Sequence, residues 1–163
     1  MTTKKLVILA MSSTLVFVFK IALFFIPNIE LVTYLLIIFT LVYGLKDAII
    51  IAFVYTILEI IVWGISEQFY IWVIIVLLTA LLKKLFKENF ILWAIYSGLL
   101  GLLFGLLCTI PIFLLTDYTF ALTYYINGLR YDVPHLIGNY IFMLLFGEIG
   151  YNKLKTLLNQ YYK

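Results

Sequence analysis

The chain has 163 residues, of which 66% are hydrophobic, 18% aromatic and only 12% charged, and its mean hydropathy is +1.16. A soluble domain of this size needs far more charge on its surface, so the composition excludes an ordinary soluble globule and indicates a protein of the bilayer. The net charge is +3, and the single cysteine, Cys108, excludes an intrachain disulfide.

Six apolar segments of roughly membrane-spanning length follow one another along the chain. We expect an all-α integral membrane protein with one domain over 1–163, whose six transmembrane helices lie at about 6–26, 30–44, 48–64, 70–82, 90–115 and 133–150. The first segment could pass for a secretory signal, but no small-x-small cleavage site follows its apolar core. We therefore interpret it as a retained helix.

Basic residues gather on one side of the predicted helices. Nine of the eleven lie near the termini or in alternate connections, namely Lys4, Lys5, Lys46, Lys83, Lys84, Lys87, Lys153, Lys155 and Lys163. The remaining connections carry acidic residues and only one basic residue, Arg130. The positive-inside rule therefore predicts that both termini are cytoplasmic.

Two ionisable residues lie inside predicted helices, where a charge is costly unless it is paired or faces a cavity. At a rise of 1.5 Å per residue, Lys20 lies about 9 Å below the outer end of the first helix. Glu59 lies about 7–8 Å below the outer end of the third helix, where Tyr55, Glu59 and Trp63 share a face. Lys20 and Glu59 could form a structural ion pair, Lys20 could instead extend to the headgroups, or both could face a ligand.

Glycines at i, i+3 and i+7 form a stripe on the fifth predicted helix, at Gly98, Gly101 and Gly105. Small residues allow two membrane helices to approach closely. The stripe predicts tight packing of this helix against a neighbour.

The connection 116–132 is the longest that this division leaves. Loops of this length are often functional, so we expect it to form an extracellular lid. Tyr125, Asn127 and Arg130 supply an aromatic ring, an amide and a planar cation that suit a small aromatic or heterocyclic ligand. Anchoring at the membrane interface explains its tyrosines equally well.

The sixth helix is expected to begin with Asp132 as its N-cap and Pro134 in its first turn. Asp132, His135 and Asn139 then share one face, at i, i+3 and i+7. Each alone has an ordinary explanation, such as helix capping or packing for His135. Because this face lies at the same outer depth as Lys20 and Glu59, the sequence predicts a binding cavity open to the outside.

Several kinds of site have no motif in this chain. It contains no P-loop, GxSxG or HExxH sequence, no cluster of cysteine and histidine, and no basic patch for nucleic acid. We therefore expect no catalytic residues, no metal site and no cofactor of its own. An intramembrane enzyme would have to use Asp132 and His135 as an acid–base pair, with no nucleophile beside them.

Four stretches resemble the substrate-binding S components of energy-coupling factor (ECF) vitamin transporters from bacteria. They are LVILAMSSTLVFV at 6–18, IPNIELVTYLLIIFTLVYGLKDAIIIAFVYTILEIIVWG at 26–64, SGLLGLLFGLLCTIP at 97–111 and INGLRYDVPHLIGNYIFMLL at 126–145. The last contains Gly-x-x-aromatic-Asp-x-x-His-x-x-x-Asn, a pattern found in one group of these proteins.

The resemblance implies a multi-pass protein of the bacterial cell membrane, with a substrate cavity near the outer face. It also implies partners, namely a membrane coupling protein and two cytoplasmic ATPase subunits that use ATP. The family docks its coupling protein on an Ala-x-x-x-Ala surface of the first helix, which corresponds here to Ala10 and Thr14, with Ser13 beside them. Thr14 departs from the family pattern but is small enough for close approach.

We expect a vitamin or vitamin precursor to be bound, without identifying which one. The expected substrate contacts are Glu59, Trp63, Tyr125, Asn127, Arg130, Asp132, His135 and Asn139. Three other functions remain open, namely a stand-alone carrier or channel, an intramembrane enzyme and a non-transporting accessory protein. A carrier acting alone usually has two inverted halves, and the sequence has no detectable internal repeat.

Overall fold

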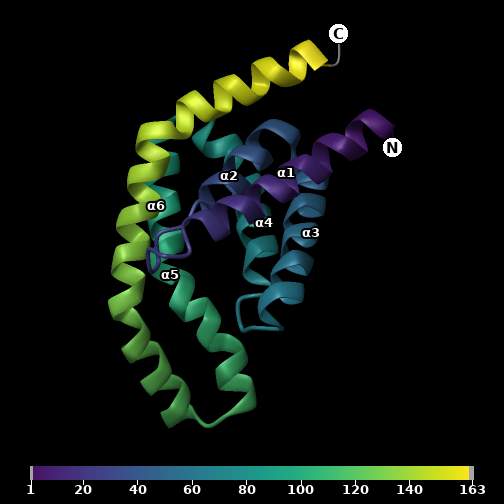
Figure 1. Ribbon diagram of the computed structural model, residues 1–163. Coiled ribbons are helices and arrows are strands. Elements are labelled where there is room, and N and C mark those ends of the chain that lie inside the picture. The colour runs from purple at the N-terminus through teal and green to yellow at the C-terminus, as the bar shows by residue number, and fades with distance from the viewer. Residues whose placement is uncertain (1, 162–163) are drawn as a thin grey trace.

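The structure is a computed structural model that describes residues 2–161. Within this range the chain is all α-helical and has no strand. The six helices are α1 (Thr3–Ala22), α2 (Val32–Tyr43), α3 (Leu45–Trp63), α4 (Ile71–Phe86), α5 (Phe90–Leu115) and α6 (Tyr118–Tyr161). The prediction of six helices in an all-α fold is confirmed. The two ends of the chain lie at the same end of the molecule, opposite the α5–α6 turn (Figure 1).

Three helices are long and apolar enough to cross a bilayer, namely α1, α5 and α6 over Tyr118–Gln160. α2 is apolar but has only 12 residues, and α4 has 16, so both are shorter than the roughly 20 residues of a typical span. α3 has 19 residues but carries Lys46, Asp47 and Glu59. A multi-pass membrane protein is therefore plausible.

The start of α6 differs from the sequence prediction. The segment 116–132 is not a loop, because α6 begins at Tyr118 and continues through Pro134 as one helix of 44 residues. Asp117 precedes this helix and accepts a hydrogen bond from the backbone N–H of Phe120 at 2.9 Å. Asp132 is therefore an interior residue of α6 and not its N-cap. The predicted bounds 133–150 were wrong at both ends, because the helix also continues past 150 to Tyr161. The other five helices begin and end within four residues of their predicted bounds.

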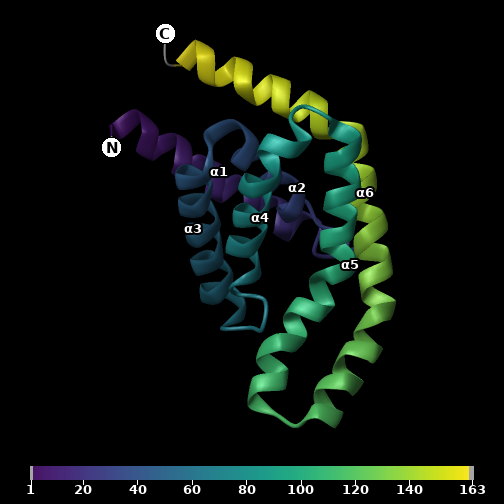
Figure 2. The ribbon, with the colours of Figure 1, turned by 180° about the vertical axis from the view of Figure 1, so that it is seen from behind.

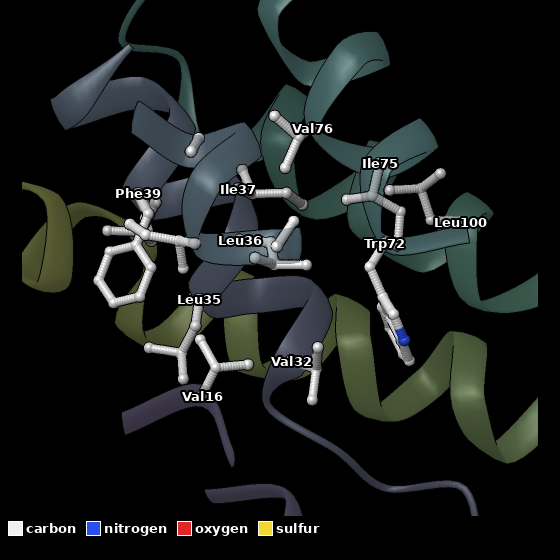
Figure 3. Packing of buried hydrophobic residues seen from close by; sticks show 14 of the residues in the cluster. Val16, Val32, Leu35, Leu36, Ile37, Phe39, Trp72, Ile75, Val76 and Leu100 are labelled. Carbon is white, nitrogen blue, oxygen red and sulfur yellow. The ribbon is translucent and has the colours of Figure 1, made fainter. Parts of the chain in front are cut away.

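α2 forms the centre of the hydrophobic core. From Val32 to Leu41 every residue except Tyr34 is buried, and α2 contacts each of the other five helices. In Figure 3 its side chains lie between Val16 of α1 and the α4 residues Ile75 and Val76. This central position explains how so short a helix can be almost completely apolar.

α5 and α6 lie side by side, and their hairpin extends beyond the α3–α4 connection (Figures 1 and 2). The glycine stripe of α5 faces α6. A Cβ atom at Gly101 would lie 2.7 Å from the backbone carbonyl carbon and oxygen of His135, and one at Gly98 would lie 3.1 Å from Cβ of Tyr140. The predicted tight packing of this helix is confirmed, and it holds the face of α6 that bears Asp132 and His135 against α5.

Candidate functional site

Two adjoining cavities are lined by the buried ionisable residues Glu30, Glu59, Asp132 and His135. The first, here called the Glu59 cavity, has a volume of about 420 Å³ and is lined in part by Lys20, Glu30, Glu59, Trp63, Trp72 and His135. The second, called the Asp132 cavity, has about 440 Å³ and is lined in part by Glu67, Cys108, Tyr124, Asn127, Arg130 and Asp132. Both cavities share Asn28, Gln68 and Phe104, so these three side chains lie at the boundary between them.

Glu59 joins α3 to α4 in the wall of the Glu59 cavity. Its Oε1 accepts a hydrogen bond from the hydroxyl of Tyr55 at 2.8 Å, and its Oε2 accepts one from Nε1 of Trp72 at 2.6 Å. All three residues are buried, and the rings of Tyr55 and Trp72 meet edge to face at 5.5 Å. Both carboxylate oxygens therefore have protein donors, which is the condition for placing a carboxylate in an apolar interior.

Lys20 does not form the ion pair with Glu59 that the sequence left open. α1 ends at Ala22, so Lys20 lies in the last turn of that helix rather than well inside a longer one. Its Nζ lies 5.8 Å from the ring centroid of Trp72, and the ion pairs of the described residues do not include Lys20 with Glu59. Lys20 is therefore a cation beside the Trp72 indole in the same cavity.

Glu30 joins the start of α2 to α6. Its carboxylate accepts hydrogen bonds from the backbone N–H groups of Val32 and Thr33, the latter at 3.1 Å, and so caps the helix. Its Oε1 lies 3.2 Å from Nε2 of His135, and both side chains are buried. The His135 ring also packs edge to face against Phe104, with centroids 4.9 Å apart. His135 therefore lies between the 23–31 connection and α5.

Asp132 joins α6 to α5 through a backbone contact. Its Oδ1 accepts a hydrogen bond from the N–H of Gly105 at 3.1 Å. A Cβ atom at Gly105 would lie 2.9 Å from Cγ of Asp132, so a glycine is needed for this approach. The second oxygen, Oδ2, is buried and has no hydrogen-bond partner among residues 2–161.

The structure divides the predicted substrate contacts into three groups. Glu59, Trp63 and His135 line the Glu59 cavity, whereas Asn127, Arg130 and Asp132 line the Asp132 cavity. The remaining two, Tyr125 and Asn139, line neither.

Tyr125 lines instead a separate apolar cavity of about 290 Å³ between α5 and α6, near the turn that joins them. Asn139 is 1% exposed, and neither atom of its amide has a hydrogen-bond partner within the described chain. Asp132, His135 and Asn139 share one face of α6 as predicted, and all three are buried. Of the three, Asp132 and His135 line the two cavities described here.

The three α1 residues expected to dock a partner do not share one surface. Ala10 and Thr14 are exposed, whereas Ser13 is buried and its hydroxyl donates to the carbonyl oxygen of Leu9 at 2.9 Å. A helix turn separates Ala10 from Thr14, so these two remain on one exposed face. The inclusion of Ser13 in that face was wrong.

Sequence reasoning missed several side chains of the site, namely Glu30, Gln68, Trp72 and Phe104. Trp72 is fully buried, and its indole N–H donates to Glu59. Glu30 had a detectable signal, because an acidic residue directly before an apolar helix is typical of a capping group. Gln68 and Phe104 are single side chains in apolar or loop segments, and no sequence pattern marks them.

The two cavities offer hydrogen-bond acceptors, two cations and aromatic rings, which is a combination suited to binding a small polar molecule. No group of three histidine, cysteine, aspartate or glutamate side chains gathers as a metal site in residues 2–161. No protein-family model, curated protein or solved structure matches this chain significantly.

Proposed function

We propose that this protein is a membrane-embedded subunit that binds a small molecule in the two adjoining cavities. The observation that carries the proposal is the convergence of buried ionisable groups from α3, α6 and the 23–31 connection on these cavities, beside the half-buried Lys20 of α1. Ionisable groups in an apolar bundle are costly, and they are usually found where they face a cavity or a partner. The cavities lie beside the α3–α4 connection, because Glu67 and Gln68 of that connection line them. This connection is away from the two ends of the chain (Figure 1).

The resemblance of four sequence stretches to ECF S components supports a more specific proposal. The protein captures a vitamin or vitamin precursor from outside the bacterial cell and delivers it inward with a membrane coupling protein and two ATPase subunits. This requires α2, α3 and α4 to lie within the membrane together with the three longer helices. An even number of crossings agrees with the two chain ends lying at one end of the fold (Figure 2).

Native mass spectrometry of the full chain, purified in detergent, tests the binding function. We expect a copurifying small molecule in the wild-type protein and its loss from Phe104→Ala, because Phe104 lines both cavities. Tyr125→Ala is the matched control, since it also removes an aromatic ring but lies in the separate apolar cavity. Equal retention by both variants would contradict the site, and absence of any bound small molecule from the wild type would favour an accessory protein.

Proteoliposomes that contain the chain alone distinguish an importer subunit from its alternatives. The compound identified by mass spectrometry should bind but should not accumulate inside these vesicles, because the proposed subunit needs its partners for energy. Accumulation without ATPase subunits would instead show a stand-alone carrier. If the protein instead converts the compound into a product, and the His135→Ala variant does not, the protein is an intramembrane enzyme.

A further inference from the structure

A buried oxygen without a partner distinguishes Asp132 from the other carboxylates near the cavities. Asp132 is only 4% exposed and lines the Asp132 cavity. Its Oδ1 is held by the N–H of Gly105, whereas its Oδ2 has no partner among residues 2–161. A buried acceptor without a donor is rare in proteins and calls for an explanation.

The other acidic groups near the cavities already have protein partners. Both oxygens of Glu59 accept hydrogen bonds, Glu30 contacts His135 and caps α2, and Glu67 accepts from the hydroxyl of Tyr124 at 2.8 Å. Only Oε1 of Glu67 has a partner, but Glu67 is half-buried. Asp132 is therefore the buried carboxylate with an oxygen that has no partner among residues 2–161.

The charges around Oδ2 of Asp132 favour a ligand group that donates a hydrogen bond. The Asp132 cavity is lined by two carboxylates, Glu67 and Asp132, and by one cation, Arg130. Arg130 is exposed, and its guanidinium lies over the ring of Tyr131 with a distance of 4.8 Å to the centroid. The buried part of the cavity thus presents acceptors, with aromatic rings such as Phe104 and Tyr124 beside them.

We propose that the Asp132 cavity selects a small aromatic molecule bearing a protonated amine or an amino group, whose N–H donates to Oδ2 of Asp132. This ligand class rests on the proposed binding function and specifies it. A hydrogen bond between a charged donor and a buried carboxylate is stronger than one between neutral groups. An anionic ligand would meet Glu67 and Asp132 and would be rejected by like-charge repulsion.

Three probes of similar size test this selectivity at pH 7, namely benzylamine as its ammonium ion, benzyl alcohol and benzoate. Binding is measured by ligand-observed NMR to the full chain in nanodiscs of zwitterionic lipid. We expect benzylamine to bind the wild type at least about tenfold more tightly than either other probe. One charge-assisted hydrogen bond accounts for a preference of this size. Equal or weaker binding of benzylamine, or no binding of any probe, would overturn the ligand class.

Asp132→Asn tests the position of the contact. The remaining carbonyl oxygen can still accept from Gly105, while an NH₂ group replaces Oδ2, so an acceptor becomes a donor. We expect the affinity for benzylamine to fall by about tenfold or more and that for benzyl alcohol to stay within about twofold. Asp117→Asn makes the same change at the exposed N-cap of α6 and should leave both affinities unchanged.

An unchanged preference in Asp132→Asn would overturn the assignment to Oδ2 even if the wild type prefers benzylamine. These measurements need neither partner subunits nor transport. Failure of selectivity therefore leaves the importer proposal standing, whereas uptake by the chain alone would overturn the importer proposal and leave the ligand class intact.

Discussion

Two helix pairs carry a buried carboxylate, and they use it differently. In the α3–α4 pair, Glu59 accepts hydrogen bonds from Tyr55 and Trp72 with both of its oxygens. In the α5–α6 pair, glycines bring the two backbones together, and Asp132 uses only one oxygen to bind Gly105. The comparison indicates that Glu59 mainly holds the structure, whereas Asp132 has an oxygen without a partner among residues 2–161, the atom that we propose contacts a ligand.

Replacing Glu59 should have the largest effect on stability. In Glu59→Leu the indole N–H of Trp72 and the hydroxyl of Tyr55 lose their acceptor inside the bundle. Each buried group left unsatisfied costs about 1–3 kcal/mol, so we expect the free energy of unfolding to fall by about 4 kcal/mol. Titration of detergent micelles with dodecyl sulfate, followed by circular dichroism, measures it. Glu59→Gln keeps one acceptor oxygen and should lose less than half as much, and equal losses would contradict this explanation.

A methyl group at Gly101 tests the contact that joins α5 to α6. The Cβ of Gly101→Ala would lie 2.7 Å from backbone atoms of His135, so the two helices must separate. We expect a loss of about 3 kcal/mol in the same unfolding titration, at the upper range for overpacking.

Gly128→Ala is the matched control on the same hairpin, because no atom lies within 4 Å of its Cβ position. Alanine favours a helix over glycine, so this variant should gain up to about 1 kcal/mol. A similar loss in both variants would show that close packing is not the cause.

Asp132→Asn should leave the stability nearly unchanged, in contrast to replacement of Glu59. Its amide oxygen keeps the hydrogen bond from Gly105, and no donor among residues 2–161 contacts the other atom. We expect the free energy of unfolding to stay within about 1 kcal/mol of the wild type. A loss as large as that of Glu59→Leu would mean that Oδ2 has a structural partner and would remove the distinction between the two carboxylates.

The smallest effect is expected at the opposite end of the fold, where Glu88 links the α4–α5 connection to α6. The hydroxyl of Tyr151 donates to Glu88 at 2.9 Å and Lys155 lies 3.3 Å away, and these contacts hold the pKa of the Glu88 carboxyl below its usual value. Because its pKa is lowered in the folded state, ionised Glu88 stabilises the protein at pH 7. This contribution is lost as the pH falls through the folded pKa.

Comparison of thermal unfolding of the wild type and Glu88→Gln at several pH values checks this linkage. The wild type should have a slightly higher Tm at pH 7, and the difference should shrink below the pKa of an unfolded glutamate, about 4.3. Surface ion pairs contribute little, so the difference at pH 7 is expected to be small. A difference that grows as the pH falls would contradict the assigned sign.

The sequence predicted the helices more accurately than the connections. Apolar segments bounded by charge or glycine located five helices within four residues, because a run of apolar side chains leaves few alternatives in a membrane. It failed at both ends of the sixth helix, at 118–132, where polar and tyrosine residues suggested a loop, and beyond 150, where the helix continues to Tyr161. The inward residues Ala121, Tyr124 and Gly128 continue the helical spacing of Asp132, and this spacing was the signal that was missed.

The candidate site was predicted only in part. Glu59, Asp132 and His135 could be found because an ionisable group in an apolar helix is conspicuous. Asn139 has the same helical spacing but lines neither cavity, and Tyr125 lines a different one. Which face of α6 meets which neighbour depends on the packing of α5, and no local pattern carries that information.

The sequence by itself determined the apolar helices, the glycine stripe of α5 and the shared face of Asp132 and His135, because composition and helical periodicity are local properties. Only the tertiary structure decided that Glu30 reaches His135, that Trp72 binds Glu59 and that Lys20 lies beside Trp72. These contacts join residues from separate helices and connections. They depend on how α2, at the centre of the core, positions the helices around it.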